Sequence, residues 1–95
     1  MTLRHASLRR LQLFEAVARL QSFSRAATEL HLTQPAVSMQ VQQLEDEVGL
    51  PLYEQMGRRL DLTPAGREVV ACARALTQRL REAEELLAAM KGVGG

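Results

Sequence analysis

The sequence has few of the residues that build disulfides, metal centres and aromatic cores. Among its 95 residues are one cysteine, two histidines, no tryptophan, one tyrosine and two phenylalanines. The single Cys72 cannot form a disulfide within the chain, and His5 and His31 lie far from it and from each other, so no metal-ligand set is recognisable. We therefore predict no metal site and a mainly aliphatic core.

Long apolar runs are also absent. No stretch approaches the roughly 18 apolar residues of a membrane helix, and the N-terminus does not resemble a signal peptide. We therefore expect a cytoplasmic protein with no membrane partner. An enzyme would need a nucleophile, an acid–base pair or metal ligands, and the candidates Cys72, His5 and His31 are isolated, which argues against an enzyme. The hydrophobic content of 46 % is sufficient for the core of one small domain.

Residues 22–47 have the pattern of two short helices joined by a tight turn. Ser22 and Thr33 suit the N-cap positions of the two helices. Pro35 falls in the first turn of the second helix, where its missing N–H costs little. Only residues 31–33 remain to connect the helices, a length typical of a helix-turn-helix, although the glycine often found in that turn is missing.

The second predicted helix has one apolar and one polar face. At 100° per residue, an apolar stripe is formed by Val37, Val41, Leu44 and Val48. The other side is polar but uncharged, and it carries Gln34, Pro35, Ser38, Met39 and Gln42. Glutamine can pair with adenine through N6 and N7, so this face is predicted to read base edges in DNA. The acidic run at residues 45–47 would stay clear of phosphates if the helix enters the groove by its N-terminus. A merely solvated polar face is the open alternative.

The charge distribution favours the same region. The net charge is only +1, but residues 1–40 contain five arginines and two glutamates, a net +3, whereas residues 41–63 contain two arginines and five acidic residues, a net −3. Positive charge near a helix-turn-helix suits contacts to phosphates, which orient a protein on DNA and make binding salt-dependent.

Two further segments flank this motif. Residues 7–20 are predicted to form a helix that precedes the motif and covers its two helices. Gly49 and Pro51 are predicted to end the second helix of the motif, the recognition helix. Residues 52–55 and 59–62 then read as two short strands around residues 56–58, the wing of a winged helix-turn-helix. Arg58 and Arg59 near its tip would contact phosphate or a minor groove; the alternative is two solvated arginines.

The last predicted element is a helix from Pro64 to about Met90, capped by Thr63. Apolar residues recur at intervals of four and three, as in a coiled-coil seam: Val69, Ala73, Leu76, Leu80, Ala83, Leu87 and Met90. A helix of this length spans about 40 Å, too long to bury its seam on so small a core. We expect its distal half to pair with a second copy, placing two recognition helices about 34 Å apart on an inverted repeat. Folding back on its own domain is the alternative.

Four blocks together resemble the N-terminal DNA-binding domain of LysR-type transcriptional regulators. They are Ser-Phe-Ser-Arg-Ala-Ala, Thr-Gln-Pro-Ala-Val-Ser, Leu-Glu-Asp-Glu-Val-Gly-Leu-Pro-Leu-Tyr and Leu-Thr-Pro-Ala-Gly, in the family's order and spacing. Within the family, His-Leu-Thr-Gln-Pro-Ala-Val-Ser-Met-Gln and Tyr-Glu-Gln-Met-Gly-Arg-Arg are most similar to regulators of Calvin-cycle carbon-fixation operons.

The resemblance implies a mainly α fold, with a winged helix-turn-helix at residues 1–62, a linker and dimerisation helix at 63–91 and a flexible end at 92–95. Family base-reading positions fall on Gln34, Pro35, Ala36, Ser38, Met39 and Gln42. Family backbone and wing contacts fall on Ser24, Arg25, Thr33, Arg58 and Arg59. Gln55 departs from the arginine common at its wing position, which puts a DNA contact there in doubt.

The resemblance also implies partners and ligands. Double-stranded DNA is the expected partner, bound as a dimer on an interrupted inverted repeat, with a tetramer expected for a full-length regulator of roughly three times this length. No cofactor is expected in this chain, and a small-molecule inducer would bind an effector domain that the sequence does not contain. The competing hypothesis is a helical adaptor that binds another protein through its coiled coil.

Overall fold

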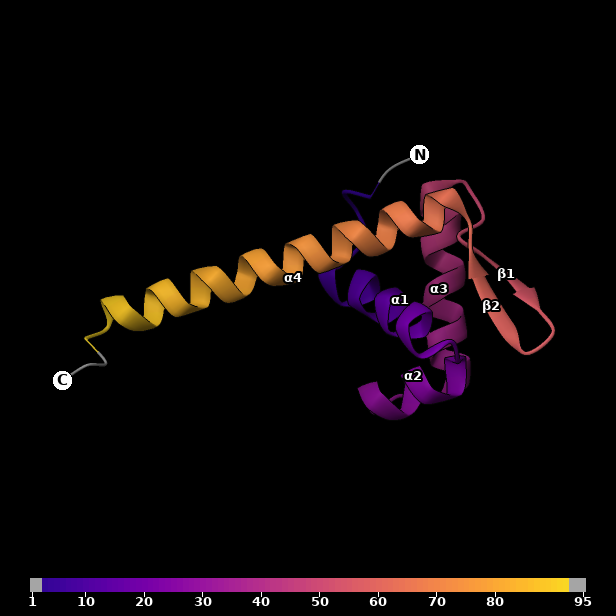
Figure 1. Ribbon diagram of the computed structural model, residues 1–95, viewed down its shortest axis with the longest axis horizontal. Helices are drawn as coiled ribbons and strands as arrows, with labels where there is room; N and C mark the ends of the chain where they lie inside the picture. The colour runs from indigo at the N-terminus through magenta and orange to yellow at the C-terminus, as the bar shows by residue number, and fades with distance from the viewer. Residues whose placement is uncertain (1–2, 93–95) are drawn as a thin grey trace.

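The computed structural model describes residues 3–92, which form four helices and one two-stranded antiparallel sheet (Figure 1). The elements follow in the order α1 (Leu8–Leu20), α2 (Phe23–Leu30), α3 (Gln34–Val48), β1 (Tyr53–Met56), β2 (Arg59–Leu62) and α4 (Pro64–Met90). This is the predicted winged helix-turn-helix followed by a long helix. Of the expected flexible end at residues 92–95, all but Gly92 lies outside the described residues.

Each helix begins with a hydroxyl side chain at its N-cap. The side-chain oxygens of Ser7, Ser22, Thr33 and Thr63 accept hydrogen bonds from the backbone N–H three residues later, at distances of 3.0–3.2 Å. These bonds satisfy N–H groups that have no partner within the helix. The caps predicted at Ser22, Thr33 and Thr63 are therefore confirmed.

The turn between α2 and α3 works without glycine because His31 adopts the left-handed conformation. Its φ is 59°, and its backbone N–H donates to the carbonyl oxygens of Ala27 and Thr28 at the end of α2. Histidine is among the non-glycine residues enriched in this region, where an L side chain costs roughly 1–2 kcal/mol. Gln21 ends α1 in the same way, with φ 57°.

The core lies where α1 packs against α3 and α4. It is aliphatic apart from Phe14, the one aromatic side chain buried completely in the described part of the chain. The predicted stripe on α3 is buried in full, from Val37 to Val48. Val69, Val70 and Ala73 at the start of α4 are also buried, so the core crosses the predicted domain boundary after Leu62.

The wing is a tight hairpin. Tyr53 pairs with Leu62 and Met56 with Arg59, which leaves Gly57 and Arg58 as a two-residue turn. Gly57 has φ 62° whereas Arg58 is not among the residues with positive φ, the pattern of a type II′ turn with glycine at its first position. Two residues fix the hairpin to the body: the ring centroid of Tyr53 lies 5.4 Å from that of Phe23 on α2, and Leu60 is buried.

The distal half of α4 projects away from this body (Figure 1), and the molecule measures 54 × 29 × 19 Å. Within residues 3–92, no helix combines the length and apolar character needed to cross a membrane.

Candidate nucleic-acid interface

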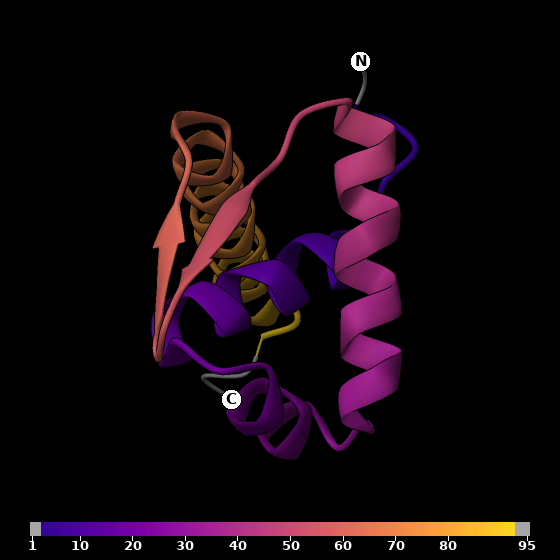
Figure 2. The same cartoon turned by 90° about the vertical axis from the view of Figure 1, so that its right-hand side faces the viewer.

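The predicted reading face of α3 is exposed. Gln34, Pro35, Ser38, Met39 and Gln42 are all open to solvent, and Ala36 is half-buried. The N-terminal end of α3 and the tip of the β1–β2 hairpin point to the same side of the molecule in both views (Figures 1 and 2). A helix and a hairpin can therefore approach one surface together.

Two side chains of this face already have hydrogen-bond partners. The Ser24 hydroxyl on α2 donates to Gln34 Oε1 at 2.9 Å, which joins these two predicted contact residues across the turn between the helices. Gln42 Nε2 donates to Asp46 Oδ1 at 3.1 Å, one turn along α3. The hydroxyl of Thr33 is occupied as the N-cap of α3.

Arg10 holds α3 in place from a side of the helix between the reading face and the core. Its guanidinium donates to Gln40 Oε1 at 2.9 Å and to Gln43 Oε1 at 3.0 Å, and it forms an ion pair with Glu47. These three partners are spaced three and four residues apart, so they lie along one side of α3. Sequence reasoning counted Arg10 among the charges available to phosphates. The structure instead uses it as a support between α1 and α3.

The acidic end of α3 is also largely internal to the fold. Glu45 Oε2 accepts a hydrogen bond of 2.8 Å from the backbone N–H of Leu52, which ties the end of α3 to the start of the wing. Glu47 pairs with Arg10, and only Asp46 of the three is exposed. These roles could not be predicted, since the partners of Glu45 and Glu47 are set by the tertiary fold.

A second ion pair removes another arginine from the positive surface. Arg19 Nη2 lies 2.5 Å from Glu29 Oε2, and Arg19 Nε lies 3.4 Å from Glu15 Oε2. The hydrogen bond to Arg19 lowers the pKa of Glu29, and the same bond raises the pKa of Arg19. The side chains of Arg9, Arg25 and Arg58, by contrast, form no hydrogen bond or ion pair within the residues that the structure describes.

The two arginines of the wing differ. Arg59 Nε lies 3.0 Å from Asp61 Oδ1 on the same strand, whereas Arg58 sits in the turn and is exposed. Gln55, which departs from the family's arginine, donates through Nε2 to the carbonyl oxygens of Gly57 and Arg59 at 3.1 and 3.2 Å. It therefore closes the hairpin turn, a role that its sequence position did not indicate.

Gln21 is a further residue that sequence reasoning missed. Its Oε1 accepts from the backbone N–H of Leu60 at 3.1 Å, and its Nε2 donates to the Ala18 carbonyl at 3.2 Å. The Gln21 side chain thus connects the end of α1 to Leu60 on β2, and it fixes the wing relative to the helices.

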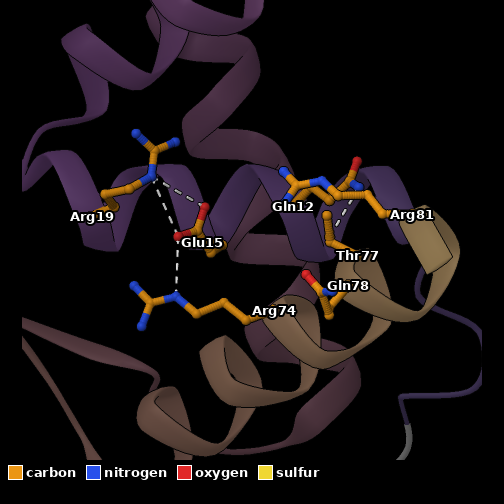
Figure 3. A pocket seen from close by; sticks show the side chains of 7 residues that line it. All are labelled: Gln12, Glu15, Arg19, Arg74, Thr77, Gln78 and Arg81. Atoms are coloured by element: carbon orange, nitrogen blue, oxygen red, sulfur yellow. Dashed lines mark hydrogen bonds and ion pairs between the residues drawn. The ribbon is translucent and has the colours of Figure 1, made fainter. Parts of the chain in front are cut away.

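A polar hollow of about 390 Å³ lies between α1 and α4 (Figure 3). Glu15 lies between Arg19 and Arg74, with Arg74 Nε 3.3 Å from Glu15 Oε2, and Gln12 Nε2 donates to Thr77 Oγ1 at 3.3 Å (Figure 3). These contacts fix α4 to α1 as far as Thr77. No group of three or more histidine, cysteine, aspartate or glutamate side chains within residues 3–92 is placed to hold a metal ion.

The predicted dimer seam needs one correction. Val69 and Ala73 are only 3 % and 1 % exposed, because they pack in the core of their own chain and cannot meet a second one. Leu76, Leu80, Leu87 and Met90 are 42–78 % exposed, and Ala83 is half-buried. The surface available to another chain therefore begins at Leu76.

Residues 8–67 match the family described as "Bacterial regulatory helix-turn-helix protein, lysR family". The chain belongs to the LysR family. The match covers α1 to the first turn of α4, which are the elements that build the reading face and the wing. The family and the similar proteins below are transcriptional regulators rather than enzymes.

Two relatives are named as transcriptional regulators, and one of them is named for the RuBisCO operon. The chain is 63 % identical over 89 residues to the "RuBisCO operon transcriptional regulator" of Allochromatium vinosum, covering 94 % of this chain and 30 % of that protein. It is 51 % identical over 92 residues to the "HTH-type transcriptional regulator CbbR" of Rhodospirillum rubrum, covering 95 % and 31 %. The chain thus spans less than a third of the length of these relatives, and its likeness to carbon-fixation regulators is confirmed.

Solved LysR-type domains share the fold. The BenM DNA-binding domain in complex with a catB site has a TM-score of 0.85 at 32 % identity, covering 94 % of this chain and 96 % of that one. The CbnR DNA-binding domain in complex with DNA has a TM-score of 0.79 at 32 % identity, covering 90 % and 98 %. Both are complexes with DNA.

Proposed function

We propose that this chain binds double-stranded DNA with sequence specificity, with the exposed face of α3 in the major groove and the wing beside it. The observation that carries the proposal is that face itself. It presents uncharged hydrogen-bonding side chains at the N-terminal end of α3. At the C-terminal end, Glu45 and Glu47 are bonded within the fold, and of this acidic run only Asp46 is exposed. Polar, uncharged groups suit base edges, which present both donors and acceptors.

Cations with no internal partner support the proposal. Arg25 lies at the start of α2 and Arg58 at the wing turn, so phosphate contacts are available on either side of the reading face. Phosphate contacts supply affinity and orientation, whereas base contacts supply specificity. Thr33 completes the proposed backbone contacts, and Arg59, paired with Asp61, takes a smaller part, whereas the single hydroxyl proton of Ser24 is engaged by Gln34 Oε1.

The proposed binding unit is a homodimer on an interrupted inverted repeat. The support is the row on α4 from Leu76 to Met90, whose leucine and methionine side chains are 42–78 % exposed. For a protein of the relatives' length we propose a tetramer, control of carbon-fixation genes in the bacterial cytoplasm, and a small-molecule inducer that binds outside the residues of this chain.

Selection from a pool of random duplexes at about 0.15 M salt, which screens weak surface attraction, tests the proposal. We expect enrichment of an interrupted inverted repeat. Gln34→Ala should then weaken binding to the selected site by about 1–3 kcal/mol and binding to random DNA far less, whereas Arg58→Ala should weaken both. An equal loss on both kinds of DNA for Gln34→Ala would remove its base-reading role.

The adaptor hypothesis is favoured by one observation, the same exposed leucines of α4. It predicts that the pool is recovered without enrichment, or not at all, while α4 still associates with a helical partner. Enrichment of any specific site excludes it as the main function.

A further inference from the structure

The Ser24 hydroxyl orients the amide of Gln34. Ser24 is the second residue of α2 and Gln34 the first residue of α3, and the 2.9 Å hydrogen bond crosses the turn between the two helices. The bond engages Oε1, so the oxygen end of the amide faces α2. The Nε2 end keeps both N–H groups without a partner among the described residues.

This orientation selects among bases. Adenine presents an acceptor at N7 and a donor at N6, so its bidentate pairing needs both ends of a glutamine amide. Guanine presents acceptors at both N7 and O6, so an N–H of Gln34 meets an acceptor at either atom, whereas adenine sets its N6 amino donor against that N–H. The sequence alone indicated only that a glutamine can pair with adenine, and it did not distinguish the two ends of the amide.

Gln42 is held with the opposite polarity. Its Nε2 donates to Asp46 Oδ1 at 3.1 Å, which leaves Oε1 and only one N–H of the amide available. An acceptor suits the exocyclic amino groups of cytosine N4 and adenine N6. The two glutamines lie eight residues apart, or about 12 Å along α3, so they meet different base pairs.

We propose that Ser24 and Asp46 are positioning residues that set the base preference of the recognition helix: Ser24 presents Gln34 as a donor to guanine, and Asp46 presents Gln42 as an acceptor for cytosine or adenine. The proposal rests on the proposed DNA binding and adds the chemistry that each position reads. Neither Ser24 nor Asp46 needs to touch a base for this effect.

The test measures base preference at single operator positions. Gln34→Ala and Gln42→Ala first locate the two positions, as those where the preference of the unmodified protein disappears. Affinities for duplexes carrying each of the four bases there are then compared for the unmodified chain, Ser24→Ala, Ser24→Thr and Asp46→Ala. Thr28→Ala is the matched control, since it removes an exposed hydroxyl from α2 that bonds only the Ser24 carbonyl.

We expect the unmodified chain to prefer guanine over adenine about tenfold at the Gln34 position. Ser24→Ala should reduce that ratio to about threefold or less, because the freed amide can turn to pair with adenine, while Ser24→Thr and Thr28→Ala keep it. Asp46→Ala should relax the preference at the Gln42 position alone.

Specific binding by the unmodified chain with an unchanged profile for Ser24→Ala and Asp46→Ala would overturn this inference and leave the proposed function standing. A uniform loss of affinity for Ser24→Ala, with no change in preference, would also overturn it and assign Ser24 to a phosphate. No sequence preference in the unmodified chain would overturn both.

Discussion

At the scale of single residues, some arginines of this chain pair with acidic side chains of the same fold, and others have charges that no acidic side chain within residues 3–92 neutralises. Arg10 and Arg19 are bonded to acidic side chains of the same fold, whereas Arg25 and Arg58 have no such partner in the described residues. Sequence alone cannot make this division, because Arg10 and Glu47 lie 37 residues apart and nothing in their local pattern connects them. Formal charge counted along the chain therefore overstates the charge offered to DNA.

Arg10→Ala should destabilise the fold by about 2–3 kcal/mol. The change removes three hydrogen bonds and leaves Glu47, whose side chain is only 23 % exposed, without its counter-ion. Among the described residues, Glu47 Oε2 already has no hydrogen-bond partner, so no second bond compensates. Arg9→Ala is the control, because the Arg9 side chain is exposed and has no hydrogen bond or ion pair among the described residues. Its free energy of unfolding should differ from that of the unmodified chain by no more than about 0.5 kcal/mol. Urea unfolding of both variants measures the difference, and equal stabilities would contradict the support role.

Tyr53 makes the stability of the fold fall with rising pH in the alkaline range. Burial against Phe23 and the nearby charge of Glu45 raise the pKa of its hydroxyl above the usual value near 10. Because the folded-state pKa is raised, its contribution to stability is complete below the unfolded-state pKa and is lost as pH rises through the folded-state pKa. As the only tyrosine in the sequence, it can be titrated alone by tyrosinate absorbance. The midpoint should be higher in folded protein than in urea, and Tyr53→Phe should remove this share of the pH dependence; coincident midpoints would contradict the burial argument.

At the scale of elements, the sequence predicted what local chemistry determines. Serine and threonine caps, Pro35 and Pro64 in first turns and the apolar stripe of α3 all lie where they were expected, because each depends on residues within one or two turns. The bonds that set the angles between elements could not be predicted. Gln21 bonds Leu60 across 39 residues, and Gln55 closes a turn that any of several polar side chains could have closed.

Gly66 shows how a local motif serves a distant contact. A Cβ built there would lie 1.9 Å from the carbonyl oxygen of Leu52, the same oxygen that accepts from Thr63 N–H at 3.1 Å. The first turn of α4 therefore lies directly on the backbone that leads into the wing. Thr63 adds to this contact by donating to the Pro51 carbonyl at 2.7 Å.

Gly66→Ala should consequently destabilise the fold, although alanine is the better helix former by about 1 kcal/mol. The clash involves backbone on both sides, and overpacking of this kind costs roughly 1–3 kcal/mol. Ala71→Gly, at an exposed position of the same helix, calibrates the propensity and should cost about 1 kcal/mol. Thermal or urea unfolding gives both values, and a stabilised Gly66→Ala variant would show that α4 can move away from Leu52.

At the scale of the whole molecule, α4 has two different halves. Within the described residues, the last polar contact to α1 is made by Thr77, and the last buried apolar side chain is Ala73. Beyond them the helix continues to Met90 with a row of exposed apolar side chains. The seam pattern in the sequence runs without interruption through both halves, so periodicity alone could not locate the point where packing within the chain stops.

Leu87→Glu should dissociate the proposed dimer without changing the monomer. Leu87 is 58 % exposed, so the isolated domain loses little packing, and glutamate is a good helix former. In a symmetric pair the change removes two buried leucines, each worth about 1.5–3 kcal/mol, so the dimer dissociation constant should rise more than about 100-fold. Ala89→Glu adds the same charge two residues away, about 200° around the helix, and should leave the dimer intact. Sedimentation over a concentration series compares the two. If both variants dimerise as tightly as the unmodified chain, or if that chain is monomeric throughout, the exposed row from Leu76 to Met90 does not hold two copies together.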